Sequence, residues 1–399
     1  MRARRHVTRE ERRARLVAGH HLARTAADVA TAVRDLVAVH SSDPATPYLA
    51  LWARVPAFTV ADLDRALYEA RSLWRLHAMR RTLFVVPTDR APVFQAACGR
   101  EIARGERRRL EAWVAQARGG DDTQPWLRAV EEATAAVLAD GVARDTRELT
   151  AAVEELSLRV RVGSGRWASE VSLASRLLPL LAIDGDVVRA RPAGTWRSSQ
   201  YQWSDAGSWF DARLPDDPTV GSDSADAAAI LSRWWLGAHG PATLTDLKWW
   251  TGWTVRATRA ALAAIGAVEV DLDHQSSGWV LPDDVDAPTP ASAGVALLPG
   301  LDPTVMGWKE RDWYLGDHAG PLFDRNGNAG PTVWVEGRVV GGWGQRPDGE
   351  VVTRLLEDVG SDAADRVAAE AAALTAWCDG TVAFPRFPSP LGTELSRPV

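Results

Sequence analysis

The feature that most constrains this 399-residue chain is a recurring order of local signals, in which helices are followed by a pair of short strands. The clearest case lies between residues 243 and 281. Thr243 with Asp246 predicts one helix start, and Thr254 predicts the next. Residues 268–281 then alternate as two strands around a turn. This order is the plan of a winged helix.

The first third of the chain shows a similar order. Helix starts are predicted at Thr8, Thr25 and Thr59, and residues 73–87 are β-branched and aromatic enough for a strand pair. The apolar face of the second helix runs directly into the segment His40 to Pro44, so we expect that helix to end there.

The middle of the chain repeats the plan once more. A helix near Pro125 and a capped helix at Asp145 and Glu148 precede an expected helix over 167–178. An Asp-Gly turn within 183–187 predicts a hairpin.

From about Gly294 the chain changes to short strands with glycine-rich turns, followed by an alanine-rich helix over 363–377. We therefore expect an α+β fold, mainly helical, with tandem winged-helix units followed by a small C-terminal β-barrel or half-barrel. Composition turns to linker residues around 218–226. The expected domains are residues 1–120, 121–218, 219–288 and 289–399, and the expected late strands are Val295–Leu298, Thr332–Val335, Arg338–Val340 and Val351–Thr353.

Charge is distributed unevenly along the chain. Residues 1–120 hold 22 Arg against 12 Asp and Glu, a net charge of +10. Because the whole chain has a net charge of −6, residues 121–399 have a net charge of −16. Only Lys248 and Lys309 are lysines, so the abundance of arginine could reflect codon usage, but codon usage does not explain the basic front. A basic front indicates a polyanionic partner.

Other classes of protein find little support in the sequence. Cys98 and Cys378 are too few and too far apart for a disulfide framework or a zinc site, which suits a reducing, cytoplasmic compartment. No stretch is apolar enough for a membrane helix. No phosphate-cradling loop is present, and the adjacent His20 and His21 cannot easily share one metal. We expect no membrane, no metal and no cofactor.

Four stretches of the chain resemble a known family: LVAVHSSDPATPYLALWARVP (36–56), MRRTLFVVP (79–87), LLPGLDPTVMGWKERD (297–312) and PTVWVEGRVVGGW (331–343). They are similar, in matching order, to those of the bacterial winged helix DNA-binding family that contains the AlkZ-like and YcaQ-like DNA glycosylases. The resemblance implies three winged-helix units and a β-barrel around a basic channel for double-stranded DNA.

The same resemblance implies a site. Glycosylase members of the family excise bulky N-alkylated purines with a Gln-x-Gln or Gln-x-Asp motif. In this sequence His40 stands at the first position of that motif and Ser42 at the second. The chain therefore departs from the family pattern at both catalytic positions.

Cleaving an N-glycosidic bond requires a positioned water opposite the departing base, because the sugar becomes oxocarbenium-like. A neutral His40 could accept a proton from that water, since histidine has an ordinary pKa of roughly 6.5. Ser42 is a weaker acceptor, and Asp43 could supply the missing carboxylate if the turn bends. The alternative is that His-Ser-Ser-Asp-Pro is an ordinary helix end and turn.

Two arginine pairs are candidate DNA contacts. Arg80 and Arg81 flank a predicted strand, and Arg256 and Arg259 share a helix face. The alternative for both pairs is a solvated surface. The sequence thus predicts a duplex-DNA-binding protein, with a monofunctional DNA glycosylase for alkylated purines as the leading hypothesis. The rival hypothesis is a non-catalytic DNA-binding or regulatory protein on the same scaffold.

Overall fold

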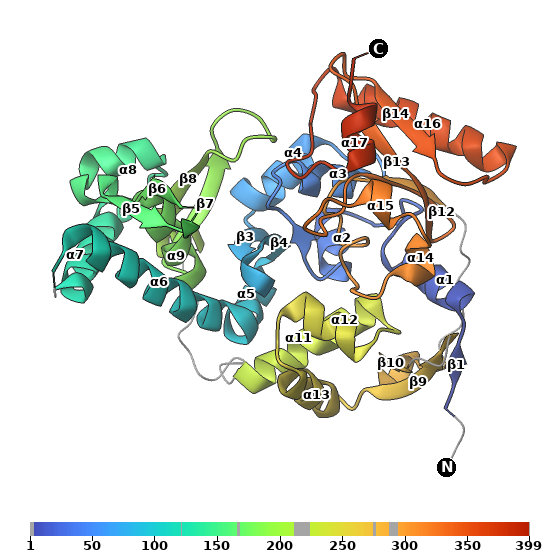
Figure 1. Cartoon of the computed structure of the whole chain (residues 1–399), viewed down its shortest axis with the longest axis horizontal. Coiled ribbons are helices and arrows are strands. Elements are labelled where there is room, and N and C mark those ends of the chain that lie inside the picture. Colours follow the sequence, from blue (N-terminus) through green and yellow to red (C-terminus); the bar gives the residue numbers. More distant parts are fainter. Residues whose placement is uncertain are drawn as a thin grey trace. The chain divides into compact units, whose positions relative to one another are not determined.

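The computed structural model describes residues 4–120, 122–165, 168–210, 224–273, 277–286 and 294–398. Helices and β-strands both occur throughout these ranges, which confirms the expected mixed fold (Figure 1). The chain divides into two compact units. The first unit comprises Met1–Leu73, Phe84–Pro87 and Ala228–Val399, and the second comprises Trp74–Leu83 and Thr88–Ala227. The finer division into four domains stays a prediction.

The first unit contains two sheets of three or more strands. In one, β1 runs parallel to β9, and β10 is antiparallel to β9. The other is fully antiparallel in the order β11-β12-β13-β14. The strands are β1 (His6–Val7), β2 (Val39–His40), β4 (Leu83–Pro87), β9 (Val268–Leu272), β10 (Ser277–Val280), β11 (Val295–Leu298), β12 (Thr332–Val335), β13 (Arg338–Gln345) and β14 (Val351–Leu355).

Helices of the first unit begin where Thr8, Thr59, Thr243 and Thr254 predict, but the start expected at Thr25 is wrong, because Asp28 caps that helix and accepts the N–H of Thr31. The side chains of Thr8, Thr243 and Thr254 each accept a backbone N–H from the first turn that follows, which satisfies a donor with no partner inside the helix. These helices are α1 (Arg9–Gly19), α2 (Val29–Asp35), α3 (Thr46–Trp52), α4 (Val60–Asp64), α11 (Ser224–His239), α12 (Leu244–Thr251), α13 (Val255–Ala264), α14 (Asp312–Leu315), α15 (Ala319–Leu322), α16 (Ser361–Cys378) and α17 (Pro390–Leu395).

The expected C-terminal barrel is an open sheet. Strands β11 and β14 lie at its two edges and do not pair with each other, so the sheet does not close. Helix α16 packs on β11 and β14, and α17 packs on β13. Figure 1 shows α16 beside β14 and α17 beside β13. A helix covering a sheet removes its apolar face from water without closure. The expectation of a barrel is therefore wrong in its closure, while strands β11 and β12 have the predicted bounds.

The helix expected to run into His40 is shorter than predicted. Helix α2 ends at Asp35, and Val37 adopts a left-handed backbone with φ +69°. This conformation breaks the helical path, so Val39 and His40 form the short strand β2 instead. Strand β2 pairs antiparallel with β4, with His40 opposite Phe84.

The second unit is built around one apolar core, to which Leu149, Leu156, Leu173 and Leu177 contribute fully buried side chains. The capping box of Asp145 and Glu148 is present as predicted. Its elements are β3 (Leu73–His77), α5 (Ala91–Phe94), α6 (Arg100–Arg118), α7 (Thr123–Leu138), α8 (Thr146–Ala152), β5 (Arg159–Val162), β6 (Ser169–Ser172), α9 (Ala174–Asp184), β7 (Val187–Pro192), β8 (Tyr201–Asp205) and α10 (Ala206–Phe210).

Two predictions for the second unit are wrong. The Asp-Gly pair near 183–187 does not form a hairpin, because Gly185 is the left-handed C-cap of α9, with its N–H bonded to the carbonyl of Leu181. The helix expected over 167–178 begins only at Ala174, since β6 precedes it. Trp167 lies outside the described residues.

Among the residues that the structure describes, no helix combines the length and apolar character that a membrane crossing requires.

Candidate functional site

The segment His40 to Asp43 lies where β2 ends. His40 is 8% exposed, and its ring stands edge-on to Phe84 of β4 at 5.3 Å between ring centroids. Its Nδ1 accepts the backbone N–H of Ser42 at 3.4 Å. The strand pairing and the aromatic contact thus fix the imidazole from one side, and the backbone of Ser42 holds it from the other.

This hydrogen bond selects a tautomer of His40. Because Nδ1 accepts a hydrogen bond, the neutral imidazole must carry its hydrogen on Nε2. The separation of 3.4 Å is longer than the usual 2.9–3.0 Å for an N–H donor, so the bond is weak. His40 therefore presents one nitrogen as a donor and holds the other in a weak internal contact.

Asp43 is the most firmly held residue of the segment. It is 8% exposed, and its two carboxylate oxygens accept the N–H groups of Ala45 at 3.0 Å and of Arg386 at 2.7 Å. Burial raises the pKa of Asp43 from its ordinary value of 3.8, although the two amide bonds and the charge of Arg386 oppose this. Burial thus dominates, and Asp43 takes up a proton more readily than an exposed aspartate.

Arg386 is a residue that the sequence did not single out. Its guanidinium Nη1 donates to the carbonyl of Ser42 at 3.4 Å, and its side chain is exposed. The residue reaches Asp43 from a position 343 residues later in the chain. No local pattern could have identified it, because only the fold brings the C-terminal segment to this loop.

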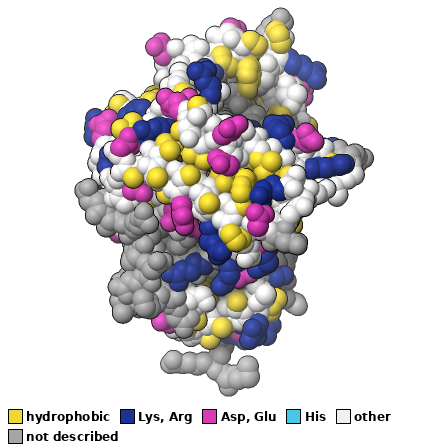
Figure 2. Space-filling model, turned by 90° about the vertical axis from the view of Figure 1, so that its left-hand side faces the viewer, with side chains coloured by type: hydrophobic (Ala, Val, Ile, Leu, Met, Phe, Trp, Pro, Cys, Tyr) yellow, Lys and Arg dark blue, Asp and Glu magenta, His cyan; other side chains and the backbone are white. Residues whose placement is uncertain are grey.

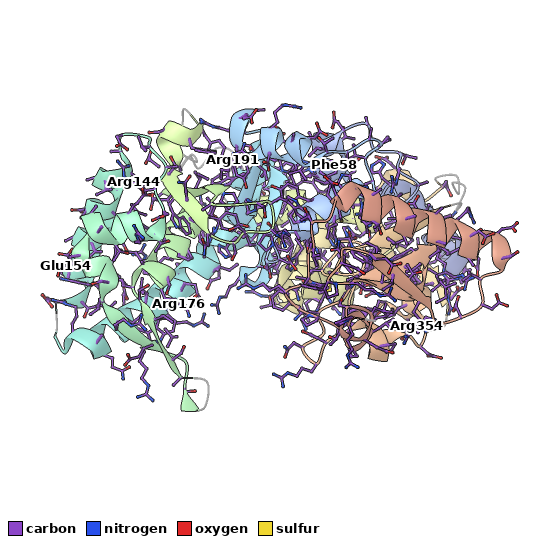
Figure 3. All side chains as sticks on the ribbon, turned by 90° about the horizontal axis from the view of Figure 1, so that it is seen from above. Phe58, Arg144, Glu154, Arg176, Arg191 and Arg354 are labelled. Carbon is purple, nitrogen blue, oxygen red and sulfur yellow. The ribbon has the colours of Figure 1, made fainter. Side chains whose placement is uncertain are left out.

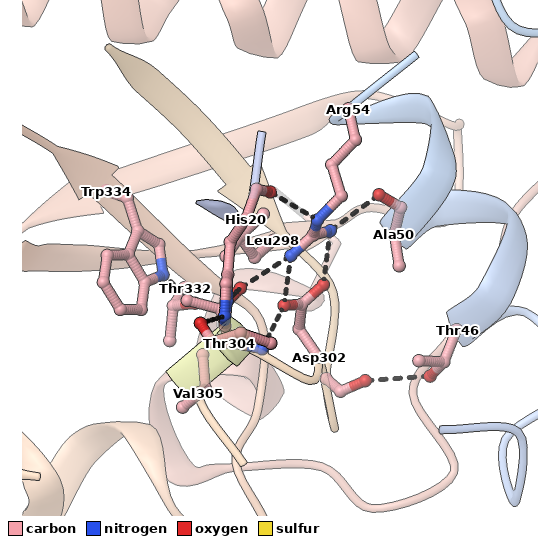
Figure 4. Close-up of polar contacts among 12 residues, drawn as sticks. His20, Thr46, Ala50, Arg54, Leu298, Asp302, Thr304, Val305, Thr332 and Trp334 are labelled. Atoms are coloured by element: carbon pink, nitrogen blue, oxygen red, sulfur yellow. Dashed lines mark hydrogen bonds and ion pairs between the residues drawn. The ribbon is translucent and has the colours of Figure 1, made fainter. Parts of the chain in front are cut away.

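A buried ion pair anchors the stretch 36–56 that carries this segment (Figure 4). Arg54 and Asp302 are both 0% exposed, and they form two parallel hydrogen bonds of 2.9 and 2.7 Å. Arg54 also donates to the carbonyls of His20 and Ala50. Thr46 adds a bond of 2.8 Å to the carbonyl of Gly300. The stretches 36–56 and 297–312 are thereby joined through Thr46 and Arg54, which follow the segment His40 to Asp43 in the chain.

The candidate residues fall into separate groups. His40, Ser42 and Asp43 lie together in the first unit. Arg256 and Arg259 are exposed on α13 of the same unit. Arg80 and Arg81 belong to the second unit, in a tight turn with φ values of +54° and +63°, and both are exposed. Arg81 forms an ion pair of 2.9 Å with Glu106.

Many basic side chains of the second unit have acidic neighbours. Arg107 contacts Glu131 at 2.6 Å and Asp184 at 2.8 Å. Figure 2 shows a face on which basic and acidic side chains alternate, with hydrophobic side chains between them. Paired arginines have less charge to offer a polyanion, so any basic site must come from arginines without acidic partners. Within the described ranges, no group of His, Cys, Asp and Glu could hold a metal ion.

Comparison with known proteins places these features in a family. The comparison with curated proteins finds no match. Among solved structures, the DNA glycosylase AlkZ of Streptomyces sahachiroi has the same fold, with a TM-score of 0.69 and 23% sequence identity over 94% of this chain and 98% of that one. The model of the family described as DNA glycosylase AlkZ-like matches residues 33–377. The match covers most of the chain, including the segment His40 to Asp43, and the protein therefore belongs to the AlkZ-like DNA glycosylase family.

Proposed function

We propose that this protein is a DNA glycosylase of base excision repair, which binds duplex DNA and hydrolyses the N-glycosidic bond of bulky N-alkylated purines. The observation that carries the proposal is the family match over residues 33–377, and the shared fold with AlkZ supports it. The local support is that Arg54 and Thr46 join the stretch 36–56, which carries the candidate segment His40 to Asp43, to the distant stretch 297–312.

A winged-helix mode of DNA binding is part of the proposal. Helices α12 and α13 are joined by Gly252 in a left-handed turn, and strands β9 and β10 follow as a wing. In such a unit the second helix enters the major groove. Arg256 and Arg259 are exposed on α13 and are the side chains that we expect to reach the phosphates or base edges.

The chemistry asks little of a general acid. A purine alkylated at N7 or N3 is already cationic and leaves readily, so the enzyme must mainly orient a water toward the sugar. His40 can accept a hydrogen bond from this water at Nδ1 once the weak bond from Ser42 is released. Asp43 is the second candidate, because its raised pKa makes it a better base than an ordinary aspartate.

The test is an excision assay with purified protein and duplex DNA that carries one bulky N7-alkylguanine. We expect release of the free modified base and an abasic site that alkali converts to a strand break. Unmodified duplex of the same sequence is the matched control, and it should stay intact. Binding of both duplexes is measured in parallel, so that absence of release can be separated from absence of binding.

One observation favours the rival function. His40 and Asp43 are each 8% exposed, and both Asp43 oxygens already hold backbone amides. Such a segment could serve only to fix the loop, which would leave a non-catalytic DNA-binding or regulatory protein. Binding of both duplexes without base release would support this rival and contradict the glycosylase.

A further inference from the structure

The second unit contains a basic pocket that the proposed chemistry does not use. The pocket has a volume of about 220 Å³, several times the share of about 30 Å³ that one water molecule takes in the liquid. Among the described residues its lining includes three arginines and one histidine but a single acidic side chain, Glu106. The lining residues are His77, Arg81, Glu106, Ser175, Arg176, Pro179, Leu180, Ile183 and Arg189.

Arg189 is the unusual member of this lining. It lies on β7 and is only 8% exposed, and its guanidinium lies 4.8 Å from the centre of the Trp203 ring. Its Nη1 has no hydrogen-bond partner among the described residues. Burial lowers the pKa of Arg189 to about 10, and no carboxylate counteracts that effect. A buried cation without a counter-charge costs stability, and the contact with the Trp203 ring offsets only part of that cost.

Two neighbours of Arg189 complete the pocket. His77 lacks a partner for its Nδ1 among the described residues, and because burial and the charges of Arg189 and Arg81 lower its pKa well below 6.5, it is a neutral polar group. Arg176 lies in the first turn of α9 and is exposed, and Figure 3 labels it on the second unit. The charge of Glu106 is already balanced by Arg81 and Arg109. The pocket therefore carries a net positive charge that no described side chain neutralises.

We propose that this pocket binds one phosphate group of the DNA backbone, with Arg189 and Arg176 as the charged contacts and His77 as a further polar contact. A phosphodiester suits the pocket because it is anionic, accepts several hydrogen bonds and fits the planar fork of a guanidinium. The inference rests on the proposed DNA-directed function, but it does not require base release.

The experiment measures binding of an undamaged fluorescent duplex by anisotropy across a salt series. Arg189→Met should weaken binding several-fold at low salt on every sequence tested. It should also flatten the slope of log K against log salt by about 0.9, the loss of one phosphate contact. Arg147→Met is the matched control, because it removes an exposed arginine of the same unit outside the pocket. The control should leave the slope unchanged.

Thermal unfolding gives a second readout and identifies the source of the phosphate. Because Arg189 is a buried charge without a counter-charge, Arg189→Met should unfold at the same temperature as the wild type or a higher one. Inorganic phosphate should raise the unfolding temperature of the wild type more than chloride at equal ionic strength, and this difference should be smaller in Arg189→Met, which keeps only the general stabilising effect of phosphate. If Arg189→Met reduces the stabilisation by inorganic phosphate but does not change the affinity for duplex DNA, the pocket binds free phosphate and the assignment to DNA is overturned.

Unchanged duplex affinity and unchanged slope in Arg189→Met overturn the inference. Should Arg189→Met fail to fold, Arg176→Met replaces it, since Arg176 is exposed and its loss leaves the core intact; an unchanged slope there overturns the inference equally. If the salt slope of the wild type depends on Arg189 but no base is released, the phosphate pocket is supported and the glycosylase is contradicted. If the wild type releases base but Arg189→Met leaves duplex binding unchanged, the glycosylase is supported and the phosphate pocket is contradicted.

Discussion

Arg54 and Asp302 form a fully buried, two-bonded ion pair across 248 positions of the chain. The Arg54 guanidinium also binds Thr304 at 2.7 Å. All the charge of this pair is withdrawn from water, so its value depends on every hydrogen bond being made. The pair fixes the stretch 36–56, which carries the candidate catalytic segment, to the stretch 297–312.

Breaking this pair should destabilise the first unit strongly. Asp302→Asn leaves the Arg54 charge buried without a counter-charge, so we expect a loss of about 3–5 kcal/mol in the free energy of unfolding. Urea unfolding followed by tryptophan fluorescence measures this loss. Glu101→Gln, which breaks the exposed pair with Arg104, is the control and should change stability little. An Asp302→Asn protein as stable as the wild type would contradict the role given to the pair.

Two buried histidines should make stability depend on pH. Burial lowers the pKa of His239 to about 3, and burial together with the charges of His239 and Arg54 lowers that of His20 well below 6.5. The unfolded chain takes up protons below roughly 6.5, whereas the folded one does not. The stabilisation is therefore full above about pH 6.5 and is lost as the pH falls toward 3, by about 1.4 kcal/mol per pH unit for each histidine.

The test of this pH dependence compares the wild type with His239→Gln. Urea unfolding at a series of pH values between 7.5 and 4.5 gives the slope of stability against pH. The slope of His239→Gln should be smaller than that of the wild type by about 1.4 kcal/mol per pH unit, which corresponds to one proton fewer taken up on unfolding. Equal slopes in the two proteins would show that His239 becomes protonated without unfolding.

Catalysis should depend on His40 more than DNA binding does. His40→Ala removes the proposed water acceptor and should lower base release by about 100-fold to 10,000-fold. The affinity of His40→Ala for duplex DNA should stay close to that of the wild type, because the His40 side chain is buried and we propose that it contacts water, not a DNA phosphate. Single-turnover excision and anisotropy measure the two effects. Normal excision by His40→Ala would remove His40 from the site but leave the enzyme.

Asp43→Asn distinguishes the two candidate bases. If Asp43 is the base, excision falls as the pH drops through a pKa above 3.8, and Asp43→Asn loses both the activity and this acidic decline. If His40 is the base, Asp43→Asn keeps most of the activity. The amide also keeps an oxygen for the N–H of Arg386, so the loop retains part of its anchor.

DNA affinity should fall steeply with salt, because arginines that contact phosphates release counterions. Reversing the charge of Arg80 and Arg81 together should weaken binding by a similar factor on every sequence, since phosphate contacts carry no sequence information. Replacing Arg256 and Arg259 by alanine should weaken binding as well, and any change in sequence preference would assign them to base edges. A flat salt response of the wild type would contradict the whole binding proposal.

The sequence by itself determined the features that depend on neighbouring residues. The caps at Thr243 and Thr254 and the bounds of β11 and β12 follow from hydrogen bonds and side-chain alternation within a few positions. The candidate segment was located by its likeness to a family, which gave the position of His40 but not its surroundings.

Only the tertiary structure decided what surrounds the candidate site. Local signals extended the second helix to His40, but pairing with Phe84 makes that residue part of a strand. The Asp-Gly pair likewise predicted a hairpin turn at Gly185, but in the structure Gly185 is the C-cap of α9. Arg386 reaches Asp43 from a position 343 residues later in the chain, and Asp302 reaches Arg54 from 248 residues later. A bond between distant residues leaves no local pattern, because its free energy is gained only when the whole fold brings the two partners together.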